Sequence, residues 1–335
     1  MWISHRMTHD PRGWIALLLV LAVVLAPAAT ATGAAPEVLQ INFGAVSAAY
    51  TPVFVAQDEG IFAKHGLRTD LKYVAAATEV QALLGGSLHI INGGPEFIDA
   101  RLGGADVIYI GALVGRFVFS LYTRPEIQRL SDLKGKVIGA TAPNALTDFA
   151  ARILIREAGL VPGQDVRILY VKGIPEVFTT LSQGVIDAGT LSPPTTLRAR
   201  RAGLRELVNL TERNVQIIQA SIGTTGAFVK EHPDIVRRYL RALVEAIHLI
   251  RTSPGVAKKA IAKYTKTTNA EDLDESYHAF LPAWGKVPYV TAASVQTLLD
   301  FSQHPGAKTA KPTDFFDSSF LAEIEKSSFV ERLYR

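Results

Sequence analysis

The chain has 335 residues, of which 48% are hydrophobic and 20% charged, and it contains no cysteine. This composition predicts a folded protein of roughly two domains. The lack of cysteine excludes disulfides, thiolate metal sites, cysteine nucleophiles and an acylated-cysteine lipid anchor. The net charge of +4 comes from 35 basic and 31 acidic residues spread along the chain, so we expect no nucleic-acid partner.

The first 35 residues have the three-part pattern of a secretory signal peptide. Arg6 and Arg12 form a basic start, the run 14–26 is apolar throughout, and small residues follow. This run is shorter than the roughly 20 residues that a membrane-spanning helix needs. We expect cleavage after Ala31 or Ala35 and a periplasmic mature protein; a retained signal anchor is the alternative.

Short apolar runs then alternate with helical patterns. Runs typical of strands cover 107–110, 137–140 and 167–171. Apolar residues at helical spacing over 146–158, followed by Gly159, predict a helix with its stop signal. Alternation of this kind predicts an α/β fold with mainly parallel sheets.

A faint internal repeat has an offset of 98 residues. Leu83, Gly86, His89 and Pro95 correspond in order to Leu181, Gly184, Asp187 and Pro193. In both copies a helix ends, a short strand follows (88–91 or 185–191), and a proline-containing turn opens a new helix. We therefore expect two similar α/β lobes.

The section from about His232 to the end has no repeat partner and is predominantly helical by its pattern. The expected helices cover residues 233–250, 255–264, 270–280, 292–301 and 318–326. We expect this section to pack on the first lobe as a helical cap.

Motifs of common enzyme classes are absent from the sequence. None of the eight histidines has metal-ligand spacing, and there is no nucleophile elbow, Walker loop or Gly-x-Gly-x-x-Gly pattern. We therefore expect no catalytic residue, no metal and no cofactor.

Four strand-to-helix turns carry small polar residues, at 47–52, 92–96, 141–145 and 192–195. Ligands of open parallel sheets bind beyond the carboxyl ends of the strands, and helix N-termini favour anionic or strongly polar groups. Helix capping alone also explains any single turn of this kind. Four of them in two lobes favour a shared cleft, whose candidate ligand-binding residues are Ser47, Tyr50, Asn92, Gly93, Glu96, Arg116, Thr141, Asn144, Ala145, Ser192 and Pro193.

Three charged features bear on the ligand. Arg116 follows a strand and offers a fork for a carboxylate or sulfonate, although a lone arginine is more often a surface residue. Glu96 argues the other way, because a carboxylate weakens anion binding or contacts a cationic or hydrogen-bonding ligand. The basic run 198–201 is typical of a solvated helix face, with docking of a partner as the alternative.

Several segments together resemble a known family: Pro52–Phe62, His65–Leu67, Ser131–Gly139, Gly184–Ala188, Pro193–Pro194, Ala202–Gly203 and Phe320–Tyr334. The family is the periplasmic solute-binding proteins of ABC importers in the nitrate, sulfonate, taurine and pyrimidine-precursor group (NMT1/SsuA-like, type II periplasmic binding fold). The resemblance covers essentially all of the chain after the signal peptide. Its motifs occur in the family's order and spacing.

The resemblance implies a two-lobe clamp with two chain crossovers and a helical C-terminal section. Lobe one is expected at 37–122 plus 221–335 and lobe two at 123–220, with hinges near 121–124 and 219–224. Family ligand contacts map here to Ser47, Tyr50, Asn92, Thr141, Asn144 and Ser192. The implied function is capture of a small polar or anionic organic solute, such as a sulfonate, aromatic carboxylate or pyrimidine-like compound. The implied partners are a membrane permease and its ATPase, with the binding protein itself a monomer.

Two departures and two alternatives accompany this resemblance. The family's usual Gly-x-x-Asp is Gly86-Ser87-Leu88-His89 here, and the Cys-rich segment of eukaryotic relatives that synthesise the thiamine pyrimidine is missing. The alternatives are an enzyme on the same fold, acting on a pyrimidine or prephenate-like substrate, and a sensor that docks on a membrane receptor.

Overall fold

The computed structural model describes residue 2, residues 36–213 and residues 215–335. The expected signal peptide, Trp2 apart, lies outside the described residues. Residues 36–335 form one unit, and the description below concerns that unit.

The first lobe is built on two strand pairs. β1 (Leu39–Phe43) runs parallel to β2 (Thr69–Tyr73), and β3 (Ile108–Arg116) runs antiparallel to β9 (Gln216–Thr224). Isolated bridges from residues 90 and 91 to β1 and β9 join the two pairs. The expected strand 88–91 is reduced to these bridges, because the chain turns away in the Asn-Gly-Gly-Pro turn directly after it.

The second lobe contains a five-stranded sheet in the order β6-β5-β7-β4-β8. β5 runs parallel to β6 and β7, and β4 runs antiparallel to β7 and β8. Its strands are β4 (Ser120–Thr123), β5 (Val137–Ala140), β6 (Arg167–Tyr170), β7 (Ala188–Leu191) and β8 (Arg205–Asn209). The expected strands at 137–140 and 167–171 are therefore present.

The chain passes between the two sheets twice, from β3 to β4 and from β8 to β9. The strands next to these crossings pair antiparallel, so both sheets are mixed instead of mainly parallel. The crossings precede the expected hinges, which lie largely within β4 and β9. In the first crossing, the Val118 N–H donates to the buried Gln219 Oε1 at 2.5 Å, so this connection is held against strand β9.

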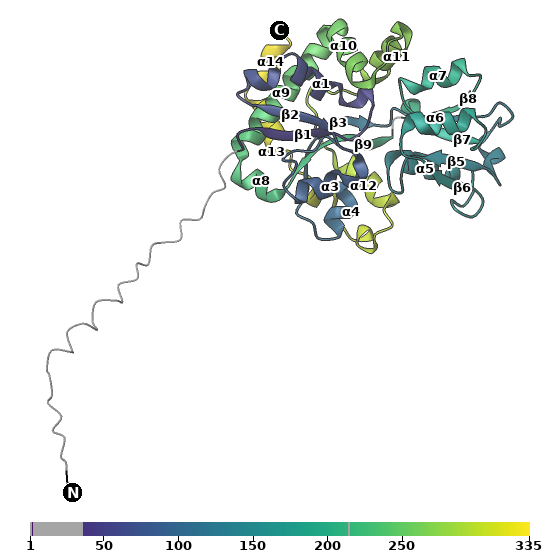
Figure 1. The fold of residues 1–335 in the computed structure, drawn as a ribbon, viewed down its shortest axis with the longest axis horizontal. Coiled ribbons are helices and arrows are strands. Elements are labelled where there is room, and N and C mark those ends of the chain that lie inside the picture. The colour runs from purple at the N-terminus through teal and green to yellow at the C-terminus, as the bar shows by residue number, and fades with distance from the viewer. Residues whose placement is uncertain (1, 3–35, 214) are drawn as a thin grey trace. The chain divides into compact units, whose positions relative to one another are not determined.

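Helices cover both sheets, and Figure 1 shows α5, α6 and α7 around the five-stranded sheet. In the first lobe the helices before β3 are α1 (Thr51–Asp58), α2 (Ile61–Lys64), α3 (Ala76–Leu84) and α4 (Phe97–Leu102). In the second lobe they are α5 (Leu146–Glu157), α6 (Ile174–Ser182) and α7 (Thr195–Arg201). The later helices are α8 (Gly226–Glu231), α9 (Pro233–Thr252), α10 (Pro254–Thr265), α11 (Ala270–Phe280), α12 (Ala292–Phe301), α13 (Ser319–Lys326) and α14 (Phe329–Leu333).

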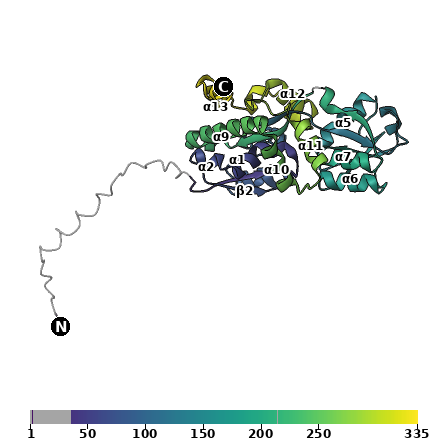
Figure 2. The ribbon, with the colours of Figure 1, turned by 90° about the horizontal axis from the view of Figure 1, so that it is seen from above.

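The C-terminal helices match the expected ones closely, because their apolar spacing is regular. In α9, Pro233 occupies the first turn, and the side chains of Ile235, Tyr239, Leu243 and Ile247 recur on one buried face. α9 and α10 pack on α1, as expected for a cap on the first lobe. The cap also reaches the second lobe, because α11 contacts α7 (Figure 2).

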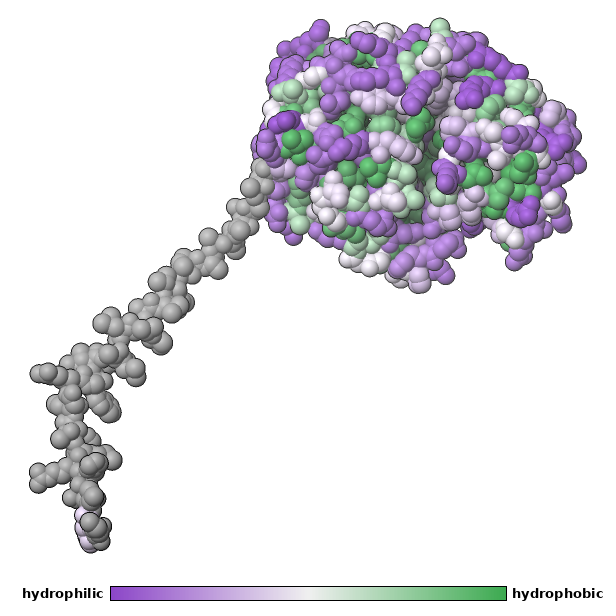
Figure 3. Space-filling view, viewed as in Figure 1, coloured by the Kyte–Doolittle hydropathy of each residue, from purple (hydrophilic) through white to green (hydrophobic). Residues whose placement is uncertain are grey.

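The described residues contain no helix that is long and apolar enough to cross a membrane. Figure 3 shows hydrophobic residues along the line where the two lobes meet, between outer surfaces that are mostly hydrophilic.

Candidate functional site

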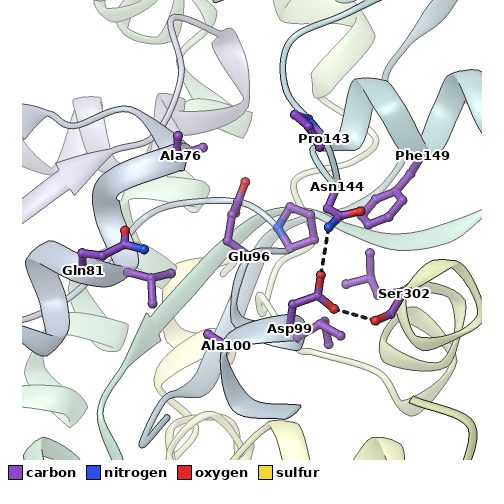
Figure 4. A pocket seen from close by; sticks show the side chains of 14 residues that line it. Ala76, Gln81, Glu96, Asp99, Ala100, Pro143, Asn144, Phe149 and Ser302 are labelled. Carbon is purple, nitrogen blue, oxygen red and sulfur yellow. Dashed lines mark hydrogen bonds between the residues drawn. The ribbon is translucent and has the colours of Figure 1, made fainter. Parts of the chain in front are cut away.

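A cavity of about 280 Å³ lies between the lobes, and we name it the α4 cavity (Figure 4). One wall comes from α3, α4 and α12 of the first lobe, and the other from the loop after β5 and from α5 of the second. Its lining residues are Ala76, Ala77, Val80, Gln81, Pro95, Glu96, Ile98, Asp99, Ala100, Pro143, Asn144, Phe149, Leu298 and Ser302.

A hydrogen-bonded bridge crosses the α4 cavity. Asn144 Nδ2 donates to Asp99 Oδ2 at 3.2 Å, and Ser302 Oγ donates to Asp99 Oδ1 at 2.5 Å (Figure 4). Nearby, the Arg156 guanidinium lies 5.2 Å from the centre of the Phe301 ring. These contacts join α5 and the loop before it to α4 and α12, so this side of the cleft is held by short polar contacts.

The loop that presents Asn144 is fixed from behind by the buried carboxylate of Asp148. Asp148 accepts from the Asn144 N–H at 3.0 Å, from Arg152 Nε at 2.9 Å and from the Tyr170 hydroxyl at 3.1 Å. Asn144 itself has a backbone φ of 60°, in the left-handed region that residues other than glycine rarely adopt. Strained backbone of this kind concentrates at functional sites, where surrounding contacts hold it.

On the first-lobe side, the 92–96 turn rests on a network of buried side chains. The Asn92 N–H donates to Asn42 Oδ1 at 2.9 Å, and Asn92 Nδ2 donates to the Tyr239 hydroxyl at 2.8 Å. The Tyr50 hydroxyl donates to the Gly93 carbonyl at 3.2 Å. Asn92 and Tyr50 therefore stabilise the 92–96 turn through buried hydrogen bonds.

Two glutamates meet at this turn. Asn42 Nδ2 donates to Glu79 Oε2 at 2.8 Å, and the Gly94 N–H donates to Glu79 Oε1 at 3.4 Å. Glu79 is fully buried, whereas Glu96 lines the α4 cavity, and the two carboxyl groups are hydrogen-bonded to each other. Burial and the nearby Glu96 carboxylate raise the pKa of Glu79 well above its usual value. Burial raises the pKa of Glu96 to about 7.

Glycine is required where the two carboxyl groups pass the backbone. A Cβ on Gly93 would lie 1.8 Å from Glu79 Oε1, and a Cβ on Gly94 would lie 2.7 Å from Glu96 Oε2. Real atoms do not approach so closely, so any side chain here displaces a carboxyl group. Gly93 and Gly94 are therefore needed to leave space for the carboxyl groups of Glu79 and Glu96, which we name the acid pair.

A second cavity of about 250 Å³ lies on the other side of the cleft, and we name it the α7 cavity. Its walls come from α6 and α7 of the second lobe and from the α10–α11 connection of the first. The charged residues in its lining are Arg198, Lys266 and Asp272, and hydroxyl groups surround them. Lys266 has φ of 55°, again in the left-handed region.

The basic run 198–201 differs from the solvated face expected of it. Arg201 Nη1 donates to Asp272 Oδ1 at 2.8 Å, and Arg200 pairs with Glu275. Arg200 Nη1 also donates to the Tyr122 hydroxyl at 2.9 Å. Arg200 and Arg201 therefore form ion pairs with acidic residues of α11, and these pairs connect the two lobes.

A family model matches this chain over residues 47–257, well over half of its length, and its description is NMT1/THI5-like. The chain belongs to the NMT1/THI5-like family. The matched range includes both cavities' second-lobe walls and the acid pair at the 92–96 turn.

One curated relative and many solved structures resemble this NMT1/THI5-like protein. A protein of Brachyspira hyodysenteriae, provisionally named an ABC transporter periplasmic binding protein, is 25% identical over 201 residues, 60% of this chain. That match spans 54% of the relative, so the chain aligns with about half of the relative's length.

Two solved structures show the same two-lobe fold. The alkanesulfonate-binding protein SsuA of Xanthomonas axonopodis, bound to MOPS, has a TM-score of 0.69 at 17% identity. The match covers 86% of this chain and 100% of that one. The nitrate-binding protein NrtA of Synechocystis has a TM-score of 0.68 at 13% identity, covering 88% and 90%. At such identities the likeness concerns the fold.

Of the predicted site residues, Glu96 and Asn144 line the α4 cavity. Ala145 is the N-cap of α5, and Ser47 is the N-cap of the 3-10 turn 48–50, where its Oγ accepts from the Ala49 N–H. The remaining residues of the four turns, Tyr50, Asn92, Gly93, Thr141, Ser192 and Pro193, lie in neither lining.

Arg116 also lies in neither cavity lining. It pairs with Gln216 at the end of β3, where the chain leaves the first sheet. The sequence analysis missed Glu79, Asp99 and Ser302. Asn42, a buried polar residue within the apolar strand β1, was the signal that could have pointed to Glu79.

Proposed function

We propose that this chain is the periplasmic solute-binding component of an ABC importer. It captures a small polar organic solute between its lobes and delivers it to a membrane permease driven by an ATPase. The chain acts as a monomer and catalyses no reaction on the solute. The observation that carries the proposal is the α4 cavity, which both lobes wall, in a chain of the NMT1/THI5-like family.

Capture requires the lobes to move relative to each other. The first connection between the sheets is bonded through Val118 to Gln219 of β9, the strand that follows the second connection, which suits this region to act as a hinge. A solute that touches Glu96 on one wall and Asn144 on the other favours the closed state, because those contacts form together only when the lobes meet. The closed form then presents one surface made of both lobes to the permease.

The first test is a thermal-shift screen of the protein purified from the periplasm. The panel contains alkyl and aryl sulfonates, aromatic carboxylates, aminopyrimidines, nitrate and bicarbonate. A solute at about a hundred times its dissociation constant adds about 2.7 kcal/mol to the free energy of unfolding. The midpoint then rises by several degrees, and a panel without any shift on folded protein contradicts the proposal.

A double variant tests the site. Asn144→Ala with Ser192→Ala should weaken a solute found in the screen by about tenfold or more, because Asn144 lines the α4 cavity and the turn that begins at Ser192 lines the α7 cavity through Thr195. The matched control is Asn209→Ala with Ser182→Ala, which changes the same residue types at positions outside both cavities. Equal affinity in the two double variants would contradict the site assignment.

The importer role is tested with an ABC permease and ATPase of the same organism, reconstituted in vesicles. The loaded binding protein should stimulate ATP hydrolysis and move the solute into the vesicles. Closure on the solute without stimulation indicates a sensor, and chemical conversion of the solute without a transporter indicates an enzyme.

A further inference from the structure

We infer that the α7 cavity is a second binding site, which takes a small oxyanion of the phosphate type and thereby holds the two lobes together. This anion is not the transported solute, so the inference goes beyond the proposed function, and only its link to lobe closure rests on that function. Two cations from opposite lobes, Arg198 and Lys266, and the buried hydroxyl group of Thr195 carry the inference.

The two cations reach the α7 cavity from opposite walls. Arg198 belongs to α7 of the second lobe, and its guanidinium lies 5.0 Å from the centre of the Phe178 ring of α6. Lys266 is the C-cap of α10 in the first lobe. Among the residues that the structure describes, neither side chain pairs with a carboxylate, although Arg200 and Arg201 of α7 do. Both charges are therefore available to a ligand.

The carboxylates near the α7 cavity are already bound to arginines. Asp272, the acidic residue of the described lining, is buried and accepts from Arg201 Nη1 at 2.8 Å. Glu271 pairs with Arg201 as well, and Glu275 pairs with Arg200. Closure brings the two cations of the lining into one cavity, where like charges repel each other. An anion between them replaces this repulsion with attraction.

Neutral donors complete the site. Thr195 is 4% exposed and lines the cavity, and within the described chain its hydroxyl group has no hydrogen-bond partner. The hydroxyl group of Thr196, in contrast, donates to Glu275 Oε1 at 2.6 Å. Asn269 is the N-cap of α11, where its Oδ1 accepts from the Glu271 N–H at 2.9 Å, so its Nδ2 remains as a donor. Buried hydroxyl groups are nearly always hydrogen-bonded, so the hydroxyl group of Thr195 indicates an acceptor that binds in the cavity.

Separated donors of this kind favour an anion with several acceptor oxygens. Guanidinium and ammonium groups are the usual protein partners of phosphate, and hydroxyl donors add to them. Chloride has a single acceptor atom and cannot join donors on opposite walls of a cavity of about 250 Å³. Because the oxyanion touches both lobes only when they meet, it favours the closed state. It then tightens solute binding by the same factor by which the solute tightens oxyanion binding.

Inorganic phosphate is the probe, titrated calorimetrically into solute-free protein from the periplasm, with sodium chloride of equal ionic strength as the reference. Wild type should bind phosphate saturably. Arg198→Gln and Lys266→Gln should each weaken binding by about tenfold or more, and Thr195→Val by about threefold or more. The control is Lys259→Gln, which changes an exposed lysine of α10 outside the cavity lining and should leave binding unchanged. Circular dichroism verifies that each variant is folded.

Small-angle scattering tests the link to closure. Phosphate should lower the radius of gyration of solute-free wild type and leave that of Lys266→Gln unchanged. A solute found in the screen should bind more tightly in saturating phosphate, and phosphate should gain the same factor in saturating solute.

The inference is overturned if phosphate does not bind saturably, if it binds Arg198→Gln and Lys266→Gln as tightly as wild type, or if it binds without compaction. If any of these results is found while a solute is transported, the inference fails and the importer function stands. If phosphate binds and compacts the protein while no solute stimulates the permease, the importer function fails and the inference stands.

Discussion

The α4 and α7 cavities have similar volumes and opposite chemistry. In the α4 cavity, carboxyl groups are buried beside glycines, and burial changes their protonation. Around the α7 cavity, arginines that remain partly in water pair with carboxylates, as Arg201 does with the buried Asp272. A buried acid pair is held largely protonated by its surroundings, whereas paired charges near the surface hold two elements together with little net energy. We therefore assign solute selection to the first cavity and contact between the lobes to the second.

The largest effect should follow from Gly93→Ala. The added Cβ displaces the Glu79 carboxyl group from its hydrogen bond with Asn42, and overpacking of this kind lowers the free energy of unfolding by about 3 kcal/mol or more. Chemical denaturation measures the loss. Gly115→Ala is the control, because nothing lies within 4 Å of a Cβ there. Similar losses in both variants would show that the crowding at the acid pair is not the cause.

The next effect concerns pH. Folding raises the pKa of Glu96 from its ordinary 4.5 to about 7, so between these values the folded protein binds more protons than the unfolded chain. The free energy of unfolding should therefore fall as pH rises through this window, by about 3 kcal/mol from Glu96, and the raised pKa of Glu79 continues the fall at higher pH. Glu96→Gln should flatten this dependence and be more stable than wild type at pH 8. A wild-type profile that rises from pH 5 to 8 would contradict the buried acid pair.

A smaller effect is expected at the other cavity. Arg200→Ala removes the ion pair with Glu275 and the hydrogen bond to Tyr122, but the Arg200 side chain is 40% exposed. Solvent screening limits the loss to about 0.5–1 kcal/mol. Small-angle scattering should show a larger population of open protein, because α7 loosens from α11. Arg213→Ala serves as the control, since Arg213 is 41% exposed, pairs with Glu157 of its own lobe and lines neither cavity.

The smallest effect is expected for Lys266→Gly. Glycine adopts the φ of 55° without strain but gains freedom in the unfolded chain, so stability should change by no more than about 0.5 kcal/mol. The affinity for a solute found in the screen, measured without phosphate, should stay within about twofold, because this cation belongs to the α7 cavity. A tenfold change would mean that the two cavities form one ligand site.

Local patterns predicted the helices well. The helices α5, α11, α12 and α13 begin and end within about one residue of their expected limits, since apolar spacing and capping residues are properties of short segments. Strand order was less accessible. The antiparallel pairing of β4 depends on where the chain crosses between the sheets. No local sequence pattern near residue 120 predicts that crossing.

For the site, sequence patterns located two residues of the cavity lining, Glu96 and Asn144, since polar turns before helices are visible in a sequence. They did not locate Glu79, because a glutamate on a helix is ordinarily solvated and nothing local indicates its burial. They also placed Arg116 among the candidates, although its pairing with Gln216 puts it at the edge of the first sheet.

The sequence by itself determined the fold class, the family resemblance, most helices and the polar turns, because these depend on residue type and short-range spacing. Tertiary structure decided which charges are buried. Asn42, Glu79 and Glu96 are 17–54 residues apart in the chain and meet because β1, α3 and the 92–96 turn pack together. The pKa of an acid depends on that packing through desolvation and neighbouring charge. The protonation state of Glu79 and Glu96 is therefore a property of the fold.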